Sequence, residues 1–143
     1  MATDFVIELG NRLSEIDRLV DALAAFCETH GVPARAAGHL ELALHELVTN
    51  VISYAWEDGR EHRLTVRVGL ADGRLTAEIV DDGHPFDPLV RPDPDIGAPL
   101  EERGIGGLGI HFVKQVVDSV VYRRDGSFNR LTLIKTISQE EKK

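Results

Sequence analysis

Residues 40–54 read LELALHELVTNVISY, and this stretch decides how the rest of the chain is arranged. Its apolar side chains recur at three- and four-residue steps, which predicts one helix with a broad stripe against a core: Leu40, Leu44, Leu47, Val48, Val51 and Ile52. Glu46 and Asn50 are four residues apart, so both border that stripe with Cβ atoms about 5–6 Å from each other. On this helix alone, a functional pair and a solvated Glu beside a structural Asn remain open alternatives.

Composition limits the class of protein. The chain has 143 residues, of which 43% are hydrophobic and 28% charged, as expected for a single domain spanning residues 1–143. Its net charge of −8 disfavours direct binding to nucleic acid and suits a basic protein surface or a metal-nucleotide. No apolar run approaches the roughly 18–20 residues that cross a bilayer, and residues 1–10 lack the features of a secretory signal. We therefore expect a soluble cytoplasmic protein whose single cysteine, Cys27, is buried.

The pattern before and after the central helix predicts an alternation of helices and strands. Residues 4–9 favour a strand. Ser14 is a candidate cap for a first helix, with Asp17 completing a capping box, and Gly31 followed by Pro33 ends that helix. The second helix, which begins at Pro33, should end near residue 55.

Hairpins and a third helix follow. Residues 63–71 and 74–80 alternate around Asp72-Gly73, a strong hairpin signal. Residues 108–117 resume helical spacing, and residues 120–124 and 130–137 form a last hairpin before a frayed tail at 138–143. This order predicts an α+β two-layer sandwich: a mostly antiparallel, mixed sheet with about three helices on one face.

Residues 82–103 contain five of the six prolines and little periodicity. Long loops inside a compact domain are uncommon unless they close over a site. We therefore expect a lid loop at about residues 82–107.

A glycine cluster, RGIGGLG at residues 103–109, ends this loop and precedes the third helix. Backbone N–H groups free of side chains can converge there on a phosphate, at the positive end of a helix. The alternative is a flexible loop at a helix start. The cluster is not a dinucleotide fingerprint, because no βαβ unit surrounds it, and it is not a Walker A loop, because no Lys-Ser or Lys-Thr pair follows.

The other polar cluster is IVDDGHPFDP at residues 79–88. Asp81 ends a predicted strand, and Gly83, two residues later, allows a flat ring to approach the backbone. Taken alone, Asp-Asp-Gly also fits an ordinary turn.

Together, the three clusters resemble the GHKL-type ATP-binding domains of gyrases, histidine kinases and MutL. Glu46 and Asn50 match the family's Glu-x-x-x-Asn box, and Asp81 with Gly83 matches its Asp-x-Gly box. The continuation HPFDP and the segment LGIHFVK after the glycines are similar to the small stand-alone serine kinases that act as bacterial anti-sigma factors. The resemblance extends from about residue 4 to residue 137.

The resemblance implies a role for each matched residue. Asn50 would hold a Mg²⁺ ion together with the ATP phosphates. Glu46 would be the general base that takes a proton from an attacking hydroxyl. Asp81 would accept a hydrogen bond from the adenine amino group, with Gly83 leaving room for the ring. Thr132 would support Asp81 through water.

The phosphate side of the implied site is the glycine cluster. Its members would wrap the phosphates, with Arg103 as a charge partner: Gly104, Gly106, Gly107, Leu108 and Gly109. One departure concerns the first box, which often continues Asn-Ala-x-x-His in such proteins, whereas Val51 and Tyr54 stand at those places here. His45 and His111 are more simply packing histidines than phosphorylation sites.

Two reactions use these boxes: activation of water in ATPases and activation of a partner's hydroxyl in the anti-sigma kinases. Because 143 residues leave no space for an ATPase transducer domain, we expect a Mg·ATP-dependent serine/threonine kinase that binds a sigma factor or similar regulator and phosphorylates a small antagonist protein. One alternative is a nucleotide-dependent module that sequesters a regulator without chemistry. Another is a detached histidine-kinase catalytic domain. Homodimerisation is implied by the resemblance alone.

Overall fold

The computed structural model describes residues 3–90 and 107–137, with side chains undescribed at 107–109. Five strands and three α-helices make up these residues, in the order β1 (Thr3–Gly10), α1 (Ile16–Thr29), α2 (Ala34–Tyr54), β2 (Arg63–Ala71), β3 (Arg74–Asp81), α3 (Gly107–Val116), β4 (Ser119–Asp125) and β5 (Phe128–Thr136). Two short 3₁₀ helices, η1 (Leu13–Glu15) and η2 (Pro88–Val90), precede α1 and follow β3.

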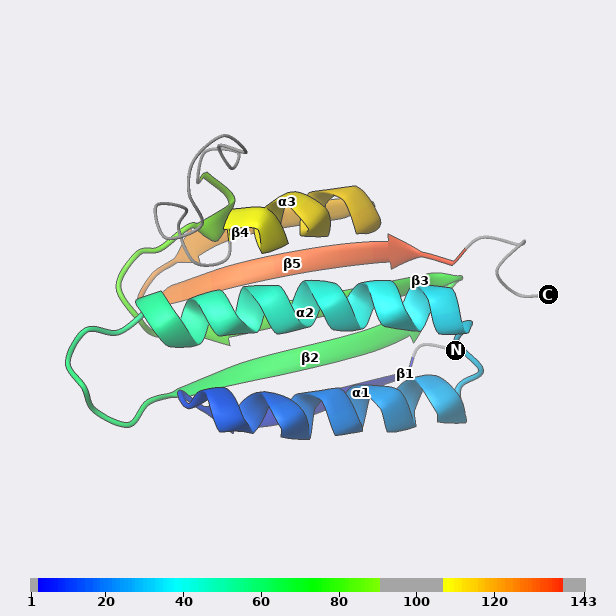
Figure 1. The fold of residues 1–143 in the computed structure, drawn as a ribbon, viewed down its shortest axis with the longest axis horizontal. Helices are drawn as coiled ribbons and strands as arrows, with labels where there is room; N and C mark the ends of the chain where they lie inside the picture. The colour runs from blue at the N-terminus through cyan, green and yellow to red at the C-terminus, as the bar shows by residue number, and fades with distance from the viewer. Residues whose placement is uncertain (1–2, 91–106, 138–143) are drawn as a thin grey trace.

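The strands form one sheet in the order β1-β2-β3-β5-β4, and every neighbouring pair is antiparallel. All three helices lie on one face of this sheet (Figure 1), so the predicted α+β two-layer architecture is confirmed. The parallel pair that a mixed sheet would contain does not occur among the described strands. The hairpin between β2 and β3 turns through Asp72 and Gly73, whose φ angles of 53° and 74° are those of the tight turn predicted for Asp-Gly.

Helix α2 is the centre of the core. It packs between α1 and α3, and its stripe of Leu40, Leu44, Leu47, Val48 and Val51 is at most 1% exposed. The inward-facing residues of the sheet complete the core from the other side, among them Leu64, Val66, Ile79 and Leu133. The helix predicted from residues 40–54 is therefore the element against which both layers are assembled.

The start of α1 differs from the prediction. Ser14 lies in η1, and α1 begins at Ile16 without a side-chain hydrogen bond at its cap. The longer Glu15 side chain reaches back instead, so that its Oε1 accepts a hydrogen bond of 2.9 Å from the backbone N–H of Gly10. This bond lowers the pKa of Glu15. The predicted capping box does not form, because Glu15, one residue after Ser14, instead links the start of the helix to the end of β1.

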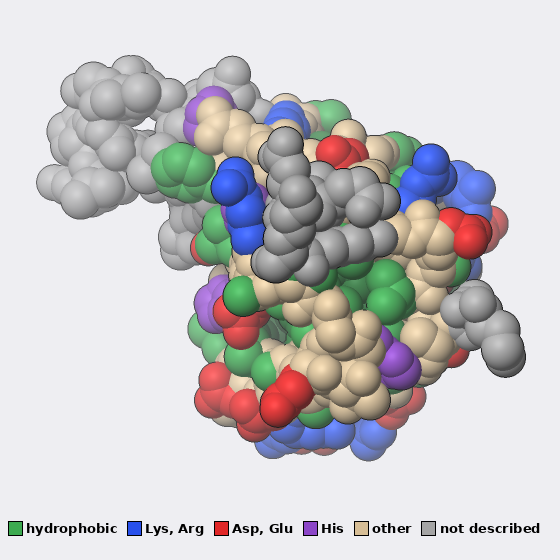
Figure 2. All heavy atoms as spheres, turned by 90° about the vertical axis from the view of Figure 1, so that its right-hand side faces the viewer, with side chains coloured by type: hydrophobic (Ala, Val, Ile, Leu, Met, Phe, Trp, Pro, Cys, Tyr) green, Lys and Arg blue, Asp and Glu red, His purple; other side chains and the backbone are tan. Residues whose placement is uncertain are grey.

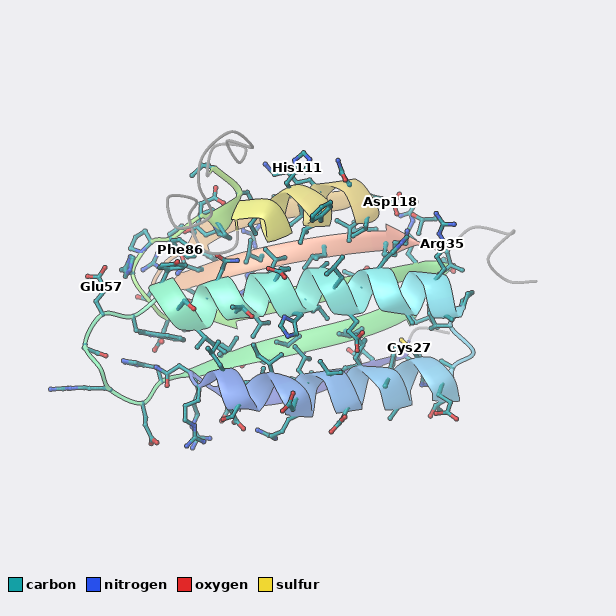
Figure 3. All side chains as sticks on the ribbon, in the orientation of Figure 1. Cys27, Arg35, Glu57, Phe86, His111 and Asp118 are labelled. Carbon is teal, nitrogen blue, oxygen red and sulfur yellow. The ribbon has the colours of Figure 1, made fainter. Side chains whose placement is uncertain are left out.

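The structure also bears on the predicted burial of Cys27 and on where the charged side chains lie. Cys27 lies between α1 and α2 (Figure 3), is 4% exposed, and has its thiol pKa raised by burial. Acidic and basic side chains are interspersed on the end of the molecule that Figure 2 presents, so the net negative charge is not gathered on that end. No helix in the described part of the chain is long and apolar enough to span a membrane.

Candidate functional site

The C-terminal half of α2 carries Glu46 and Asn50. Asn50 is 1% exposed, and its side-chain Nδ2 donates a hydrogen bond of 2.7 Å to the backbone carbonyl of Glu46. Because the amide nitrogen is directed at the helix backbone, Oδ1 is on the opposite side of the amide group. The Glu46 side chain is partly exposed. One turn of helix therefore presents a fixed amide and an accessible carboxylate.

Asp81 is the last residue of β3 and is 3% exposed. Its Oδ1 accepts two hydrogen bonds of 2.9 Å, one from the backbone N–H of Gly83 and one from Nδ2 of Asn129. Burial raises the pKa of Asp81, while the bonds from Asn129 and Gly83 act in the opposite direction. Among the described residues, no donor reaches Oδ2. The buried carboxylate thus has one oxygen occupied and one available, which fits a ligand donor such as an adenine amino group.

Gly83 brings this carboxylate close to α2. A Cβ at residue 83 would lie 2.3 Å from the carbonyl oxygen of Ala55, far inside any permitted contact. The next residue, His84, donates its backbone N–H to the same carbonyl at 2.9 Å. We predicted that Gly83 leaves room for a ring; in the structure the space beside its Cα is filled by the end of α2. Glycine is required here because two backbones approach each other.

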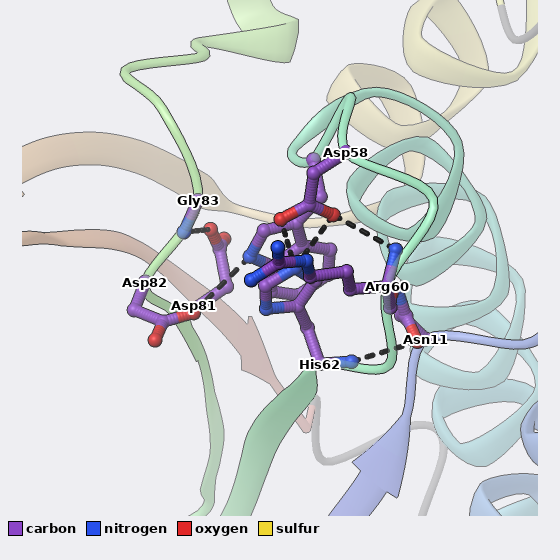
Figure 4. Close-up of polar contacts among 8 residues, drawn as sticks. Asn11, Asp58, Arg60, His62, Asp81, Asp82 and Gly83 are labelled. Atoms are coloured by element: carbon purple, nitrogen blue, oxygen red, sulfur yellow. Dashed lines mark hydrogen bonds and ion pairs between the residues drawn. The ribbon is translucent and has the colours of Figure 1, made fainter.

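Further contacts fasten the loop after β3 to the C-terminal end of α2. His84 Nε2 donates to the carbonyl of Tyr54 at 2.7 Å, which satisfies a carbonyl that the helix itself leaves without a partner. The indole N–H of Trp56 donates to Asp82 Oδ1 at 3.1 Å, and Asp82 lies between Asp81 and Gly83, which are joined by their own bond (Figure 4). Phe86, at the same end of α2 (Figure 3), packs on Tyr54 with ring centroids 5.6 Å apart. The first and second boxes are thereby held as one unit.

Replacing Gly83 by Ala should destabilise the protein by about 1–3 kcal/mol, because the added methyl group forces the loop away from Ala55. Denaturant unfolding monitored by circular dichroism would measure the loss. Gly38, which lies in α2 with open space around its Cα, is the matched control, and its Ala variant should be as stable as wild type or more so. Equal stability of the Gly83 variant and wild type would show that the close approach is not required.

Thr132 is misplaced by the sequence prediction. Side chains alternate along β5, and Leu131 and Leu133 are in the core, so Thr132 lies on the sheet face that the helices do not cover. It lines a shallow cavity there with Glu78 and Val121. The residue opposite Asp81 in the register is Asn129, which bonds directly to Asp81, whereas Thr132 was expected to support Asp81 through water. The sequence offered a signal for it, a polar residue at a core-facing position of β5, but only the strand register pairs it with Asp81.

Changing Thr132 to Val should therefore leave nucleotide affinity unchanged, because the hydroxyl lies on the other side of the sheet from Asp81. Titration calorimetry with ATP and magnesium would test this. A clear loss of affinity would restore Thr132 to the site.

The glycine cluster is described only in part. Gly107 begins α3, and the backbone of Leu108 and Gly109 forms its first turn beside α2. Arg103, Gly104 and Gly106 lie outside the described residues, as does the predicted lid between residues 91 and 106. Within residues 3–90 and 107–137 there is no group of three or more His, Cys, Asp or Glu side chains that could hold a metal.

The sequence around these residues matches a known family. A sequence model of the histidine kinase-like ATPase domain matches residues 9–135. This chain belongs to the histidine kinase-like ATPase domain family. The GHKL-type resemblance stated from the three boxes is thereby confirmed.

Curated relatives of this family member include bacterial protein kinases. Serine-protein kinase RsbW of Listeria monocytogenes is 26% identical over 103 residues, which are 69% of this chain and 66% of the relative. Serine/threonine-protein kinase BtrW of Bordetella bronchiseptica is 25% identical over 70% of each chain. Serine-protein kinase RsbW of Bacillus subtilis is 26% identical over 57% of this chain and 53% of its own length. The chain thus spans about half to 70% of these relatives.

Solved structures agree on the fold. The RsbU and RsbW domains of Rv1364c from Mycobacterium tuberculosis superpose with a TM-score of 0.70 and 15% identity, over 96% of this chain and 33% of that one. The histidine kinase domain from the Erythrobacter litoralis EL346 blue-light activated histidine kinase gives 0.58 with 19% identity, over 90% of this chain and 62% of that one.

Proposed function

We propose that this histidine kinase-like ATPase domain is a Mg·ATP-dependent protein serine/threonine kinase of the anti-sigma type, which phosphorylates a small antagonist protein and binds a sigma factor or similar regulator. The relatives named as serine-protein kinases support the reaction class. Residues 1–143 would form a single domain with this activity, and the protein would work in the cytoplasm. Homodimerisation remains a proposal that follows from the family resemblance.

The observation that carries the proposal is the half-occupied carboxylate of Asp81. A buried carboxylate costs free energy unless its oxygens are paired, and among the described residues only Oδ1 is paired. Acids whose pKa is raised by burial and that also have specific hydrogen-bond partners are common at binding sites. Gly83 holds the same carboxylate against the end of α2, the helix that carries Glu46 and Asn50. An adenine amino group would supply the donor that Oδ2 lacks.

The remaining roles are those that the family resemblance implies, and they suit the chemistry of phosphoryl transfer. Glu46 takes the proton of the attacking serine or threonine hydroxyl while the hydroxyl oxygen bonds to the γ-phosphorus of ATP. The bond between the γ-phosphorus and the β,γ-bridging oxygen breaks, and ADP leaves. Asn50 Oδ1 would hold Mg²⁺ together with the phosphates, and the bound ion supplies the positive charge that offsets theirs. The backbone N–H groups of Gly104, Gly106, Gly107, Leu108 and Gly109, with Arg103, would surround the phosphates.

Two measurements test the proposal. Titration calorimetry with magnesium present should detect ATP and ADP binding, and labelled ATP should transfer its phosphate to a serine or threonine of the antagonist protein. Absence of nucleotide binding by correctly folded protein would overturn the whole proposal. Transfer of an acid-labile phosphate would instead identify a histidine-directed kinase, since phosphohistidine is acid-labile and phosphoserine is not.

The alternative is a nucleotide-dependent binding module that sequesters its regulator without catalysis. The observation in its favour is Tyr54, which stands where the first box often has His and whose ring packs on Phe86. Such a module would bind ATP or ADP and its regulator but transfer no phosphate. The transfer assay with the antagonist present separates the two functions.

A further inference from the structure

We propose that Asn129 is the positioning residue for adenine recognition, because its side-chain amide holds the Asp81 carboxylate in one orientation with only Oδ2 available to the base. This inference rests on the proposed function, and it assigns to the site a residue that lies in none of the three sequence boxes. It concerns selectivity for the base rather than the chemical step.

Burial first singles out Asn129. Among the described residues, only three polar or charged side chains are buried: Asn50 at 1%, Asp81 at 3% and Asn129 at 2% exposed. Two of these three belong to the nucleotide site by their boxes. A buried amide in an apolar core costs free energy that an apolar side chain of similar size would avoid. Asn129 must therefore have hydrogen-bond partners, and one of them is Asp81.

The polar atoms of Asn129 are fully engaged. Its Nδ2 donates both hydrogens, one to Asp81 Oδ1 at 2.9 Å and the other to the carbonyl of His84 at 2.8 Å. Its Oδ1 accepts from the hydroxyl of Tyr122, from Nη1 of Arg124 at 3.2 Å, and from the backbone N–H of Phe86 at 3.3 Å. Rotating the amide would break bonds to β3, to β4 and to the loop after β3. The donor toward Asp81 is therefore fixed.

Arg124 adds a second constraint from the edge strand. The same Nη1 that contacts Asn129 donates to the carbonyl of Gly83 at 2.8 Å. Asp81, Asn129, Arg124 and the backbone of Gly83 thus form one closed ring of hydrogen bonds. Networks of this kind hold a group in one geometry when every member is satisfied. Among these members, Asp81 keeps one oxygen, Oδ2, without a donor among the described residues.

The consequence for base selection follows from donors and acceptors. Adenine offers an amino donor where guanine offers a carbonyl acceptor, so an ionised Oδ2 attracts the first and repels the second. The bond from Asn129 lowers the pKa of Asp81 against the opposing effect of burial. Without that bond, Asp81 would hold a proton at higher pH, and a protonated carboxyl could donate to guanine. Asn129 therefore keeps Asp81 both oriented and ionised.

The test compares ATP and GTP binding by titration calorimetry with magnesium, at several pH values, for wild type and Asn129→Leu. The ratio of GTP to ATP dissociation constants should fall by at least about 10-fold in the variant, the amount expected for losing a hydrogen bond to a charged group. The loss of ATP affinity on acidification should also begin at higher pH than in wild type. A merely structural role would change the unfolding midpoint and move neither readout.

Asn11→Leu is the matched control. Asn11 also bonds through both ends of its amide, to the carbonyl of Arg60 and the N–H of His62, each at 3.0 Å, in the loop before β2. Its variant should lose stability and keep the wild-type ratio and pH profile. Asn129→Thr restores one donor toward Asp81, so it should recover part of the selectivity, and it carries the test if Asn129→Leu does not fold.

The outcomes separate the two claims. If wild type binds ATP and both Asn129 variants retain its ATP to GTP ratio and pH profile, the positioning role is wrong and the kinase proposal stands. If wild type binds neither nucleotide, the proposed function fails, and the inference that rests on it fails too.

Discussion

Replacing Asp81 by Asn should weaken ATP binding by at least about 100-fold, because the amide would present a donor to the donor of adenine and leave a buried polar pair unmatched. The variant keeps the rest of the site intact. Both structural hydrogen bonds to residue 81 end on Oδ1, from Gly83 and from Asn129, and an amide oxygen in that place accepts them equally well. Only the atom directed at the base changes.

The same variant should be as stable as wild type at neutral pH, or more stable. Burial raises the folded-state pKa of Asp81 above the value in the unfolded chain. As pH rises from the ordinary value to the raised one, the unfolded state loses its proton first, so the folded state loses stability across that window and remains less stable above it. Asn does not titrate. The stability advantage of the variant should therefore shrink as pH falls through the window.

Calorimetric ATP titration and denaturant unfolding, both repeated at several pH values, would measure these two effects. Asp82→Asn is the control, since Asp82 is the neighbouring carboxylate and is exposed, bonded to Trp56. It should retain ATP binding. If Asp81→Asn bound ATP as tightly as wild type, Asp81 would not read the base.

Replacing Glu46 by Gln should reduce phosphate transfer to the antagonist by roughly 100- to 10,000-fold, the usual contribution of a general base. Gln has the same size and cannot take the proton of the attacking hydroxyl. The helix should be unaffected, because the contact between residues 46 and 50 uses the backbone carbonyl of Glu46 and the side chain of Asn50. ATP affinity should therefore remain close to that of wild type.

Single-turnover transfer of labelled phosphate, with calorimetry in parallel, would separate the chemical step from binding. Glu41→Gln provides the control, since Glu41 is an exposed carboxylate earlier in α2. It removes the same charge without touching the site. Transfer at the wild-type rate by the Glu46 variant would refute the assignment of the base and leave nucleotide binding in place.

Local periodicity predicted most of the architecture. The apolar spacing of residues 40–54 identified the central helix, and Asp72-Gly73 located the turn between β2 and β3. The predicted start of α1 was wrong. Ser14 and Asp17 formed a plausible capping box, but the side chain of Glu15 instead accepts a hydrogen bond from Gly10 at the end of β1. That contact joins two elements, so no local pattern announces it.

What the sequence by itself determined was the set of elements and three polar clusters, because each depends on residues a few positions apart along one helix, turn or loop. Tertiary structure alone decided which of them meet. The antiparallel register of β3 and β5 places Asn129 opposite Asp81 and turns Thr132 to the other face, since one residue of register reverses the side on which a strand presents its side chains. Gly83 likewise acquires its role only when the loop after β3 packs on Ala55 at the end of α2. Long-range pairing of backbones therefore selected Asn129 as the hydrogen-bond partner of the Asp81 carboxylate.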